Sequence, residues 1–339
     1  MNLYRISLIC CVCCFLWACP GSIFSSRDGD FMDKIIPLTE FNSEFDDYNS
    51  TLPMNKSGEG FLVFSSKREK KNYFNLVSFP VRVDNKDASN PIATSNIGYG
   101  SDYIALHNFV AGYIAKTSGN HNVLGPYVLN NYNLTNFGNS QKNQFLYYAD
   151  DSAGNLDIKV IYQNNTETVG PVNVDFLNSK KDDAYPFISQ LGDKIYFCSN
   201  RDGSFDIYEA TVGDKSSTDS KTNITQQITK PLESKIEKMS VLSSLFDDKC
   251  PFLSYNILVF TSNRAGGFGG YDIYYSVKKD GKWSEPINAG SRINTEYDEY
   301  RPVIIAENSF NFPLMIFSSN RKGGKGGFDL YMTGLLKSY

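Results

Sequence analysis

Short apolar runs alternate with polar turns along the second half of the chain. Three of these runs continue into Ser-Asn-Arg, then a glycine-rich turn, then Asp-Ile-Tyr or Asp-Leu-Tyr; the three copies span residues 195–208, 258–274 and 315–331. An apolar run, a tight turn and a second apolar run are typical of two antiparallel strands. Glycine fits such turns because it adopts positive φ without steric cost. The pattern therefore predicts a strand–turn–strand unit that recurs along the chain.

A second pattern precedes these units. It consists of an apolar residue, a small polar pair and, after two variable positions, an acidic pair; the four copies span residues 41–47, 177–183, 242–248 and 293–299. Pro186, Pro251 and Pro302 follow the last three copies, whereas the first copy has only the more distant Pro53. Proline suits the beginning of a strand because it fixes φ and lacks a donor. We expect this segment to link the outer strand of one unit to the inner strand of the next.

Repeats of about 40 to 60 residues with several strands each are typical of propeller blades. The sequence therefore predicts an all-β protein with a single β-propeller over residues 35–339. Weaker units begin at Phe61 and Phe145, and residues 109–115 form a further candidate, so we expect six four-stranded blades. Five or seven blades follow if the stretch around Phe109 is misread. Residues 35–41 are expected to pair in the last blade and close the ring, which removes exposed sheet edges.

An insertion at residues 213–246 interrupts the fourth of these blades. Within it, Leu232, Ile236 and Met239 recur at a helical spacing, with Thr229 as a candidate cap and Pro231 in the first turn. We expect a helix packed over the edge of the ring. A partner-binding helix and a loop are the alternatives.

The N-terminus has the features of a targeting segment. Arg5 precedes an apolar stretch, residues 6–18, that is too short to span a bilayer. Residues 1–18 are therefore expected to be a signal peptide and residues 19–34 a tether. Leu16-Trp17-Ala18-Cys19 resembles a bacterial lipobox, which implies lipidation of Cys19 and anchoring to the outer membrane of a bacterium, on its periplasmic or surface side. Ordinary secretion is the alternative.

The composition and charge of the chain argue against some classes of partner and of covalent cross-link. The chain has 41% apolar residues and a net charge of −4 with no basic cluster, so a nucleic-acid partner is not expected. Five of the seven cysteines lie within the first 19 residues. Cys198 and Cys250 occupy different positions of the repeat, which favours two separate thiols over the disulfide that an oxidising compartment would permit.

The linkers and the turns between second and third strands should share one face, because successive strands of a blade are antiparallel. We expect the arginines of these turns to form ion pairs that order each blade. The candidate pairs join Arg201, Arg264 and Arg321 to Asp182, Asp247 and Asp298 or to Asp206, Asp272 and Asp329.

Three binding hypotheses apply to this face. The repeated carboxylates could hold calcium. The glycine-rich turns could hold phosphate, although they lead into strands and not into helix N-termini. A recognition surface could use residues of the types enriched at interfaces; its candidates are Arg201, Arg264, Arg321, Phe268, Tyr271 and Phe328.

The three clear repeats resemble the PD40 family, also called WD40-like or TolB-like propeller repeats, of bacterial envelope proteins. Residues 283–288 are similar to the outer-strand segment of envelope lipoproteins of that family, whereas residues 1 to about 170 match poorly. The resemblance implies a non-enzymatic module that binds an envelope protein partner or acts as a scaffold. It implies neither a cofactor nor a metal.

Catalytic motifs are not found in the sequence. It has no Gly-x-Ser-x-Gly and no paired-histidine metal motif, and its two histidines, His107 and His121, are expected to be loop or core residues. We therefore expect no enzyme. The alternative is a propeller that binds or cleaves a glycan at the mouth of its central channel, where an Asp and Glu pair could serve hydrolysis.

Overall fold

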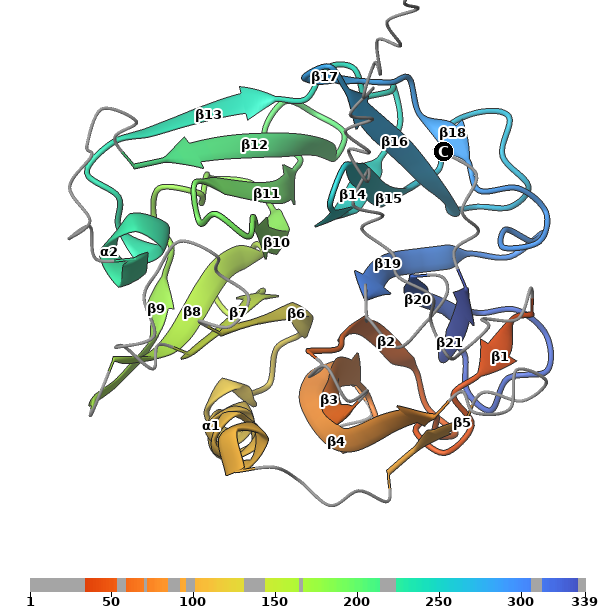
Figure 1. Ribbon diagram of the computed structural model, residues 1–339, viewed down its shortest axis with the longest axis horizontal. Coiled ribbons are helices and arrows are strands. Elements are labelled where there is room, and N and C mark those ends of the chain that lie inside the picture. The colour runs from red at the N-terminus through yellow and green to blue at the C-terminus, as the bar shows by residue number, and fades with distance from the viewer. Residues whose placement is uncertain are drawn as a thin grey trace, which may run out of the picture.

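The computed structural model describes residues 34–53, 59–69, 72–84, 92–95, 101–130, 144–164, 167–213, 224–305 and 313–334. Within them, five antiparallel sheets surround one axis as the blades of a propeller (Figure 1). The predicted all-β fold with a single propeller is confirmed. The predicted six blades are wrong, because the structure has five.

Each blade runs from an inner strand at the axis to an outer strand at the rim. Blade 1 contains β2 (Asp47–Thr51), β3 (Glu59–Ser66), β4 (Asn75–Asp84) and β5 (Ile92–Thr94). Blade 2 contains β6 (Val123–Asn130), β7 (Gln144–Asp150), β8 (Asp157–Asn164) and β9 (Glu167–Asn173). Blade 3 contains β10 (Asp183–Ile188), β11 (Lys194–Ser199), β12 (Asp206–Val212) and β13 (Ser234–Lys238).

The last two blades complete the ring. Blade 4 contains β14 (Asp248–Ser254), β15 (Ile257–Ser262) and β16 (Asp272–Lys279), which pairs with both β17 (Lys282–Trp283) and β18 (Ile287–Asn288). Blade 5 contains β19 (Glu299–Ile305), β20 (Leu314–Ser319), β21 (Asp329–Gly334) and β1 (Ile36–Pro37).

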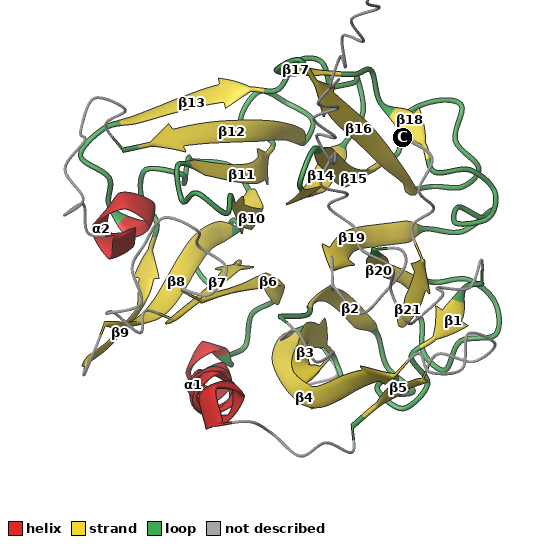
Figure 2. Ribbon diagram, viewed as in Figure 1, coloured by secondary structure: helices red, strands yellow, loops and turns green. Residues whose placement is uncertain are grey.

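The blade count differs because the stretch around Phe109 is helical. It lies in α1 (Ser101–Thr117), which stands beside blades 1 and 2 (Figure 2). Phe109 and Val110 are buried, and Tyr113 and Ile114 pack against the same cluster. Residues three and four positions apart share one face of a helix, as Tyr113 does with Val110 and Phe109. These apolar side chains therefore cover the junction of two blades and do not form a blade of their own.

The predicted closing strand is confirmed. Ile36 lies opposite Met332 in the antiparallel pair of β1 and β21. Just beyond β1, the Asn42 side chain accepts from the Leu330 amide at 2.8 Å and donates to the Leu330 carbonyl at 3.0 Å. The two ends of the described chain are thus joined in blade 5.

The prediction of a helix at residues 229–246 of the insertion is wrong. The helix α2 (Ile224–Thr229) ends at the residue expected to begin it, and residues 234–238 are instead the outer strand of blade 3. Leu232 is 90% exposed, so it contributes no buried helical stripe. Ile236 lies opposite Ala210 of β12 and packs on the core, and this pairing with a neighbouring strand outweighs the weak local periodicity.

The second strand of each blade is buried on both of its faces, because each sheet packs between two neighbouring sheets. In β11, Ile195 to Cys198 are all buried, and the equivalent positions of β15 and β20 are buried as well. This packing explains why these runs are continuously apolar and do not alternate.

Cys19 and the predicted signal peptide lie outside the described residues, so lipidation and outer-membrane anchoring stay predictions, as do the domain limits. Over the described ranges, no helix is long and apolar enough to cross a membrane.

Candidate functional site

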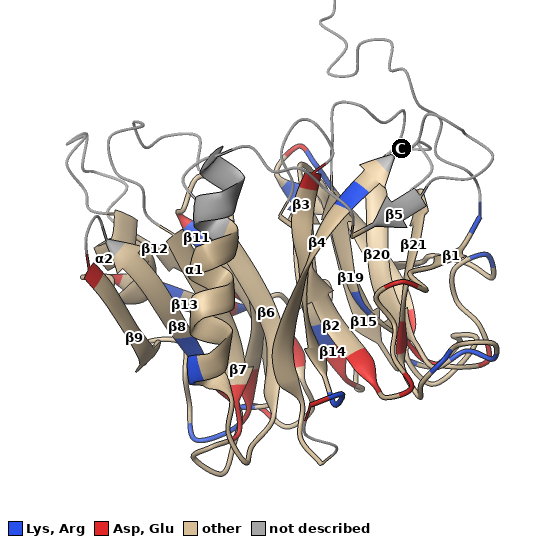
Figure 3. Cartoon of the chain, turned by 90° about the horizontal axis from the view of Figure 1, so that it is seen from below, with Lys and Arg blue, Asp and Glu red and all other residues tan. Residues whose placement is uncertain are grey.

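All five inner strands begin at the same face, which also carries the linkers and the turns between second and third strands. We call it the turn face. Seen from the side, charged residues of the described strands gather toward this face, at the lower edge of Figure 3.

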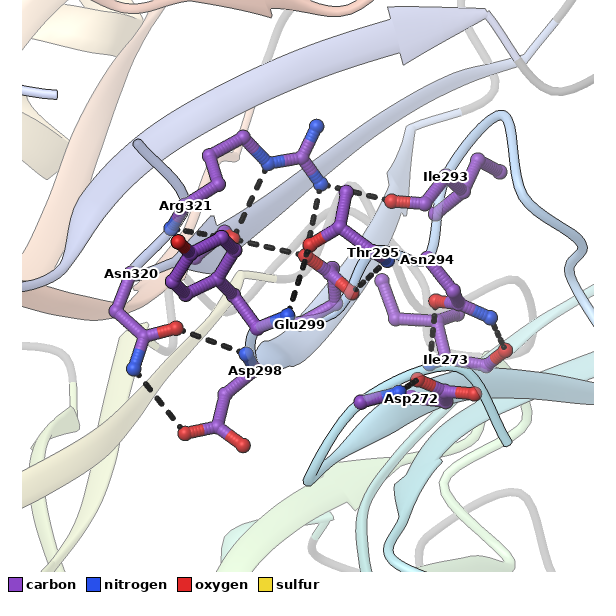
Figure 4. Close-up of polar contacts among 12 residues, drawn as sticks. Asp272, Ile273, Ile293, Asn294, Thr295, Asp298, Glu299, Asn320 and Arg321 are labelled. Atoms are coloured by element: carbon purple, nitrogen blue, oxygen red, sulfur yellow. Dashed lines mark hydrogen bonds and ion pairs between the residues drawn. The ribbon is translucent and has the colours of Figure 1, made fainter. Parts of the chain in front are cut away.

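An arginine of each Ser-Asn-Arg turn bridges its own blade to the linker. Arg321 donates from Nη2 to Glu299 Oε1 at 3.0 Å and to the Ile293 carbonyl at 2.7 Å, and from Nε to Ser319 Oγ at 3.1 Å (Figure 4). Glu299 is fully buried. The same arrangement recurs in Arg68 with Asp47, Arg201 with Asp183 and Arg264 with Asp248.

These ion pairs confirm the expected ordering role of the arginines but correct their partners. The guanidinium binds the second acid of each pair, not Asp182, Asp247 or Asp298 and not the acids that open the third strands. The second acid is the first residue of the inner strand and lies opposite the serine of the turn, as Asp183 lies opposite Ser199. Arg201, Arg264 and Arg321 are therefore held by structural contacts, and their predicted part in a recognition surface stays a prediction.

The residue at the position of the first acid links neighbouring blades; it is an aspartate in four blades and Asn122 in blade 2. Asp298 Oδ1 accepts from the Tyr271 amide of the preceding blade at 2.8 Å. The equivalent contacts join Asp46 to Phe328, Asn122 to Phe74, Asp182 to Leu156 and Asp247 to Phe205. Repetition in all five blades shows that these side chains serve the fold. Of the residues that the structure describes, no group of three or more His, Cys, Asp or Glu is placed to hold a metal ion, so the calcium hypothesis gains no support.

The glycine-rich turns bind carboxylates of the chain itself. Asp272 accepts from the amides of Phe268 and Gly269, at 2.7 and 3.1 Å. Asp329 accepts in the same way from the amides of Lys325 and Gly326, at 2.7 and 3.2 Å. The amides that a phosphate would need are therefore already occupied, and the phosphate hypothesis has no support.

A collar of half-buried side chains surrounds the axis at the turn face. Each blade contributes the residue that precedes its third strand; these are Phe74, Leu156, Phe205, Tyr271 and Phe328. Tyr48 and Tyr300 lie inside the collar. Tyr48 has its ring centroid 4.8 Å from Phe328 and 5.0 Å from Tyr300, and Tyr300 lies 5.2 Å from Tyr271. We call this end of the central channel the mouth.

One polar cluster breaks the apolar collar. Lys249 Nζ lies 2.9 Å from Asp247 Oδ2, and the Tyr271 hydroxyl donates to the same oxygen at 2.8 Å. Lys249 also donates to the Tyr271 hydroxyl at 3.2 Å and lies over the Phe205 ring, 4.2 Å from its centroid.

The cluster keeps a carboxylate charged at the mouth. Burial alone would raise the pKa of Asp247, but hydrogen bonds from Lys249, the Phe205 amide and Tyr271 outweigh it and lower that pKa below its usual value. Burial lowers and the bond to Asp247 raises the pKa of Lys249, with a net increase. Burial raises the pKa of Tyr271 to about 12. At neutral pH the mouth therefore presents a carboxylate, an ammonium group and a neutral phenol.

The sequence prediction found part of this site. Tyr271 and Phe328 belong to the collar, whereas Phe268 projects from the tip of its turn and is 51% exposed. Lys249 was missed, and the only signal for it is a departure from the repeat: the second residue of the other inner strands is Tyr48, Leu124, Ala184 or Tyr300.

The remaining candidates have packing roles. His107 lies 5.8 Å from the Phe61 ring, and His121 Nε2 lies 4.0 Å from Asp150 Oδ2. Cys198 and Cys250 are buried free thiols, which confirms the favoured expectation of separate cysteines.

No protein-family model and no curated protein matches the chain. Solved structures with a similar fold include an endo-arabinase from Bacteroides thetaiotaomicron VPI-5482, with 13% identity and a TM-score of 0.52, covering 89% of this chain and 97% of that one. They also include a thermostable family-43 glycoside hydrolase, with 10% identity and a TM-score of 0.52, covering 88% of this chain and 93% of that one. At these identities the likeness shows the fold, a five-bladed propeller.

These comparisons correct the expectations drawn from the PD40 resemblance. No family model supports that family, and the similar solved structures are glycoside hydrolases. The expected non-enzymatic scaffold depended on that resemblance and is overturned with it. The expected envelope protein partner has no support from the comparisons. The expectation of no enzyme is corrected by the same neighbours.

Proposed function

We propose that the protein is a carbohydrate-active propeller that holds a glycan at the turn-face mouth of its central channel. The observation that carries this proposal is the collar of half-buried side chains, four of them aromatic, together with the polar cluster of Asp247, Lys249 and Tyr271. Ligand sites typically combine apolar and aromatic walls with a few fixed polar groups.

A sugar ring matches both parts of the mouth. Its C–H faces are apolar and can pack on the rings of Tyr48 and Tyr271, while its hydroxyl groups both donate and accept. The Asp247 carboxylate accepts hydrogen bonds and the Lys249 ammonium donates them. Because the two groups are already held by each other at 2.9 Å, their orientation is fixed before a ligand arrives.

Hydrolysis of a glycosidic bond needs a second carboxyl group. Asp247 has the lowered pKa of a base. The equivalent acids of the two neighbouring blades are Asp182 and Asp298. Asp182 accepts from the Leu156 amide and Asn200, and Asp298 accepts from the Tyr271 amide and Asn320. Both oxygens of Asp247 are bonded as well, so neither neighbour stands out as a second catalytic carboxyl group. The described residues therefore support the binding of a glycan. Cleavage of the glycan has to be measured in the same experiment.

The test is a panel of plant and bacterial polysaccharides, beginning with arabinan because one similar structure is an endo-arabinase. Binding is followed by calorimetry and cleavage by release of reducing ends. We expect at least one polysaccharide to bind, and Tyr271→Ala to weaken its binding at least tenfold. Phe268→Ala, which removes an exposed ring at the tip of the same turn, is the matched control and should bind as the wild type does. If no polysaccharide of the panel is bound or cleaved, or if both variants weaken binding equally, the proposal fails.

A further inference from the structure

Below the mouth, a ring of five backbone bulges surrounds the axis. Each inner strand has its third residue at positive φ; the five residues are Asn49 (57°), Gly125 (60°), Tyr185 (57°), Cys250 (57°) and Arg301 (51°). The register of each inner strand shifts directly after this residue. A bulge of this kind re-aims a side chain. At Gly125 no side chain fits, because the Tyr185 ring occupies the space that a Cβ would need.

Arg301 belongs to this ring and is fully buried. Its side chain reaches from blade 5 to blade 2, where Nη2 donates to the Pro126 carbonyl at 3.3 Å, and its guanidinium carbon lies 5.4 Å from the centroid of the Tyr185 ring. The Nε and Nη1 donors of Arg301 have no partner among the described residues. Ser50 on the neighbouring inner strand also has a buried hydroxyl without a partner there.

The charge of Arg301 is not balanced by the groups around it. A guanidinium group stays protonated in proteins, and a buried charge without a counter-charge is costly. Arg68, Arg201, Arg264 and Arg321 each bind a buried carboxylate, but Arg301 forms no ion pair with a described residue.

The titratable groups beside Arg301 are neutral. Burial raises the pKa of the Cys250 thiol to about 12, and it raises the pKa values of Cys198, Tyr127 and Tyr185 as well. None of these four groups is therefore an anion at neutral pH. Within the described residues, Arg301 is therefore a buried positive charge without a counter-charge.

We propose that Arg301 holds a small monovalent anion, chloride, within the central channel. Complete burial of the guanidinium group favours an ion over a sugar or a peptide carboxylate, which would need an open path. The unpartnered Nε and Nη1 groups of Arg301 supply the donors. This anion would be a constant part of the ring and is separate from the glycan site at the mouth.

Thermal unfolding in two salts tests the proposal. At equal ionic strength, the wild type should melt about 2 to 5 °C higher in sodium chloride than in sodium gluconate, because an ion that binds only the folded state stabilises it. Arg301→Met should abolish this difference. Lys235→Met, which removes an exposed cation of the outer strand β13 with 72% of its side chain accessible, is the control and should keep it.

Bromide replacement in crystals gives an independent readout that needs no variant. The proposal expects an anomalous bromide peak within about 3.5 Å of Arg301 Nη1 or Nε. Equal melting temperatures of the wild type in chloride and gluconate would overturn the proposal, whether or not such a peak is seen, because a peak alone would show binding at crystal concentration only. If Arg301→Met does not fold, the comparison of the wild type in chloride and gluconate and the bromide experiment still test the proposal.

Discussion

At the scale of residues, the position of an arginine decides what it does. Arg264 in a turn binds the buried Asp248 carboxylate at 2.6 Å, and the repeat in the sequence indicates only that this arginine forms an ion pair. Arg301 lies on an inner strand and follows no repeat, so the sequence alone did not single it out. The sequence predicted that the turn arginines form ion pairs, but it could not predict the second acid as the partner. That choice depends on the strand register, in which Asp248 lies opposite Ser262.

Arg264→Met tests the energetic weight of one such pair. The substitution leaves the fully buried Asp248 without its cation, and we expect a loss of about 3 kcal/mol in the free energy of unfolding. Urea denaturation measures this loss. The control is Lys235→Met, whose exposed pair with Glu237 should contribute less than about 1 kcal/mol. Similar losses in the two variants would contradict the assigned role.

The lowered pKa of Asp247 predicts a pH dependence with a defined sign. A carboxyl group with a lower pKa in the folded state stabilises the fold above its unfolded pKa, close to 3.8, and this stabilisation is lost as pH falls through the folded value. The melting temperature of the wild type should therefore exceed that of Asp247→Asn by a constant amount above about pH 5. The difference should shrink toward pH 3. A difference that grows on acidification would contradict the account.

At the scale of elements, the middle strands were predictable and the rim of the ring was not. Continuous apolar runs such as Ile195 to Cys198 are buried on both sides and carry a clear signal. The outer strand β13 has only Ile236 facing the core, so its assignment depends on pairing with β12, which lies outside the reach of a local pattern. The stretch around Phe109 is helical for a different reason. Apolar residues in a short run do not distinguish a strand from a helix, so its local pattern could not exclude a helix.

The joint between β1 and β21 makes a prediction at this scale. Asn42→Ala removes the side chain that satisfies both the amide and the carbonyl of Leu330. We expect a loss of about 1 to 3 kcal/mol in the free energy of unfolding, because these buried groups lose their partner. Thr39→Ala, in the exposed turn after β1, is the control and should have little effect on urea denaturation. An unchanged midpoint for Asn42→Ala would show that the closing strand is not held by this residue.

At the scale of the whole molecule, the repeat predicted a propeller but not its family. Three repeated features stabilise the blades: the ion pair between turn and linker, the contact between neighbouring blades and the carboxylate bound in the glycine turn. They depend on the fold and carry no information about function. The residues that differ from blade to blade lie at the axis, at the second and third positions of the inner strands; Lys249 and Arg301 are two of them. The side chains that these positions bring to the axis become visible only when the five strands are placed around it, so the site could not be assembled from the sequence.

A structure of the protein with a bound oligosaccharide tests the central claim most directly. The account predicts a sugar ring packed against Tyr48 or Tyr271 at the mouth, with a hydroxyl group within hydrogen-bond distance of Asp247 or Lys249. An oligosaccharide bound on the opposite face or at the rim of the ring would contradict it, even if the protein proved to bind or cleave glycans.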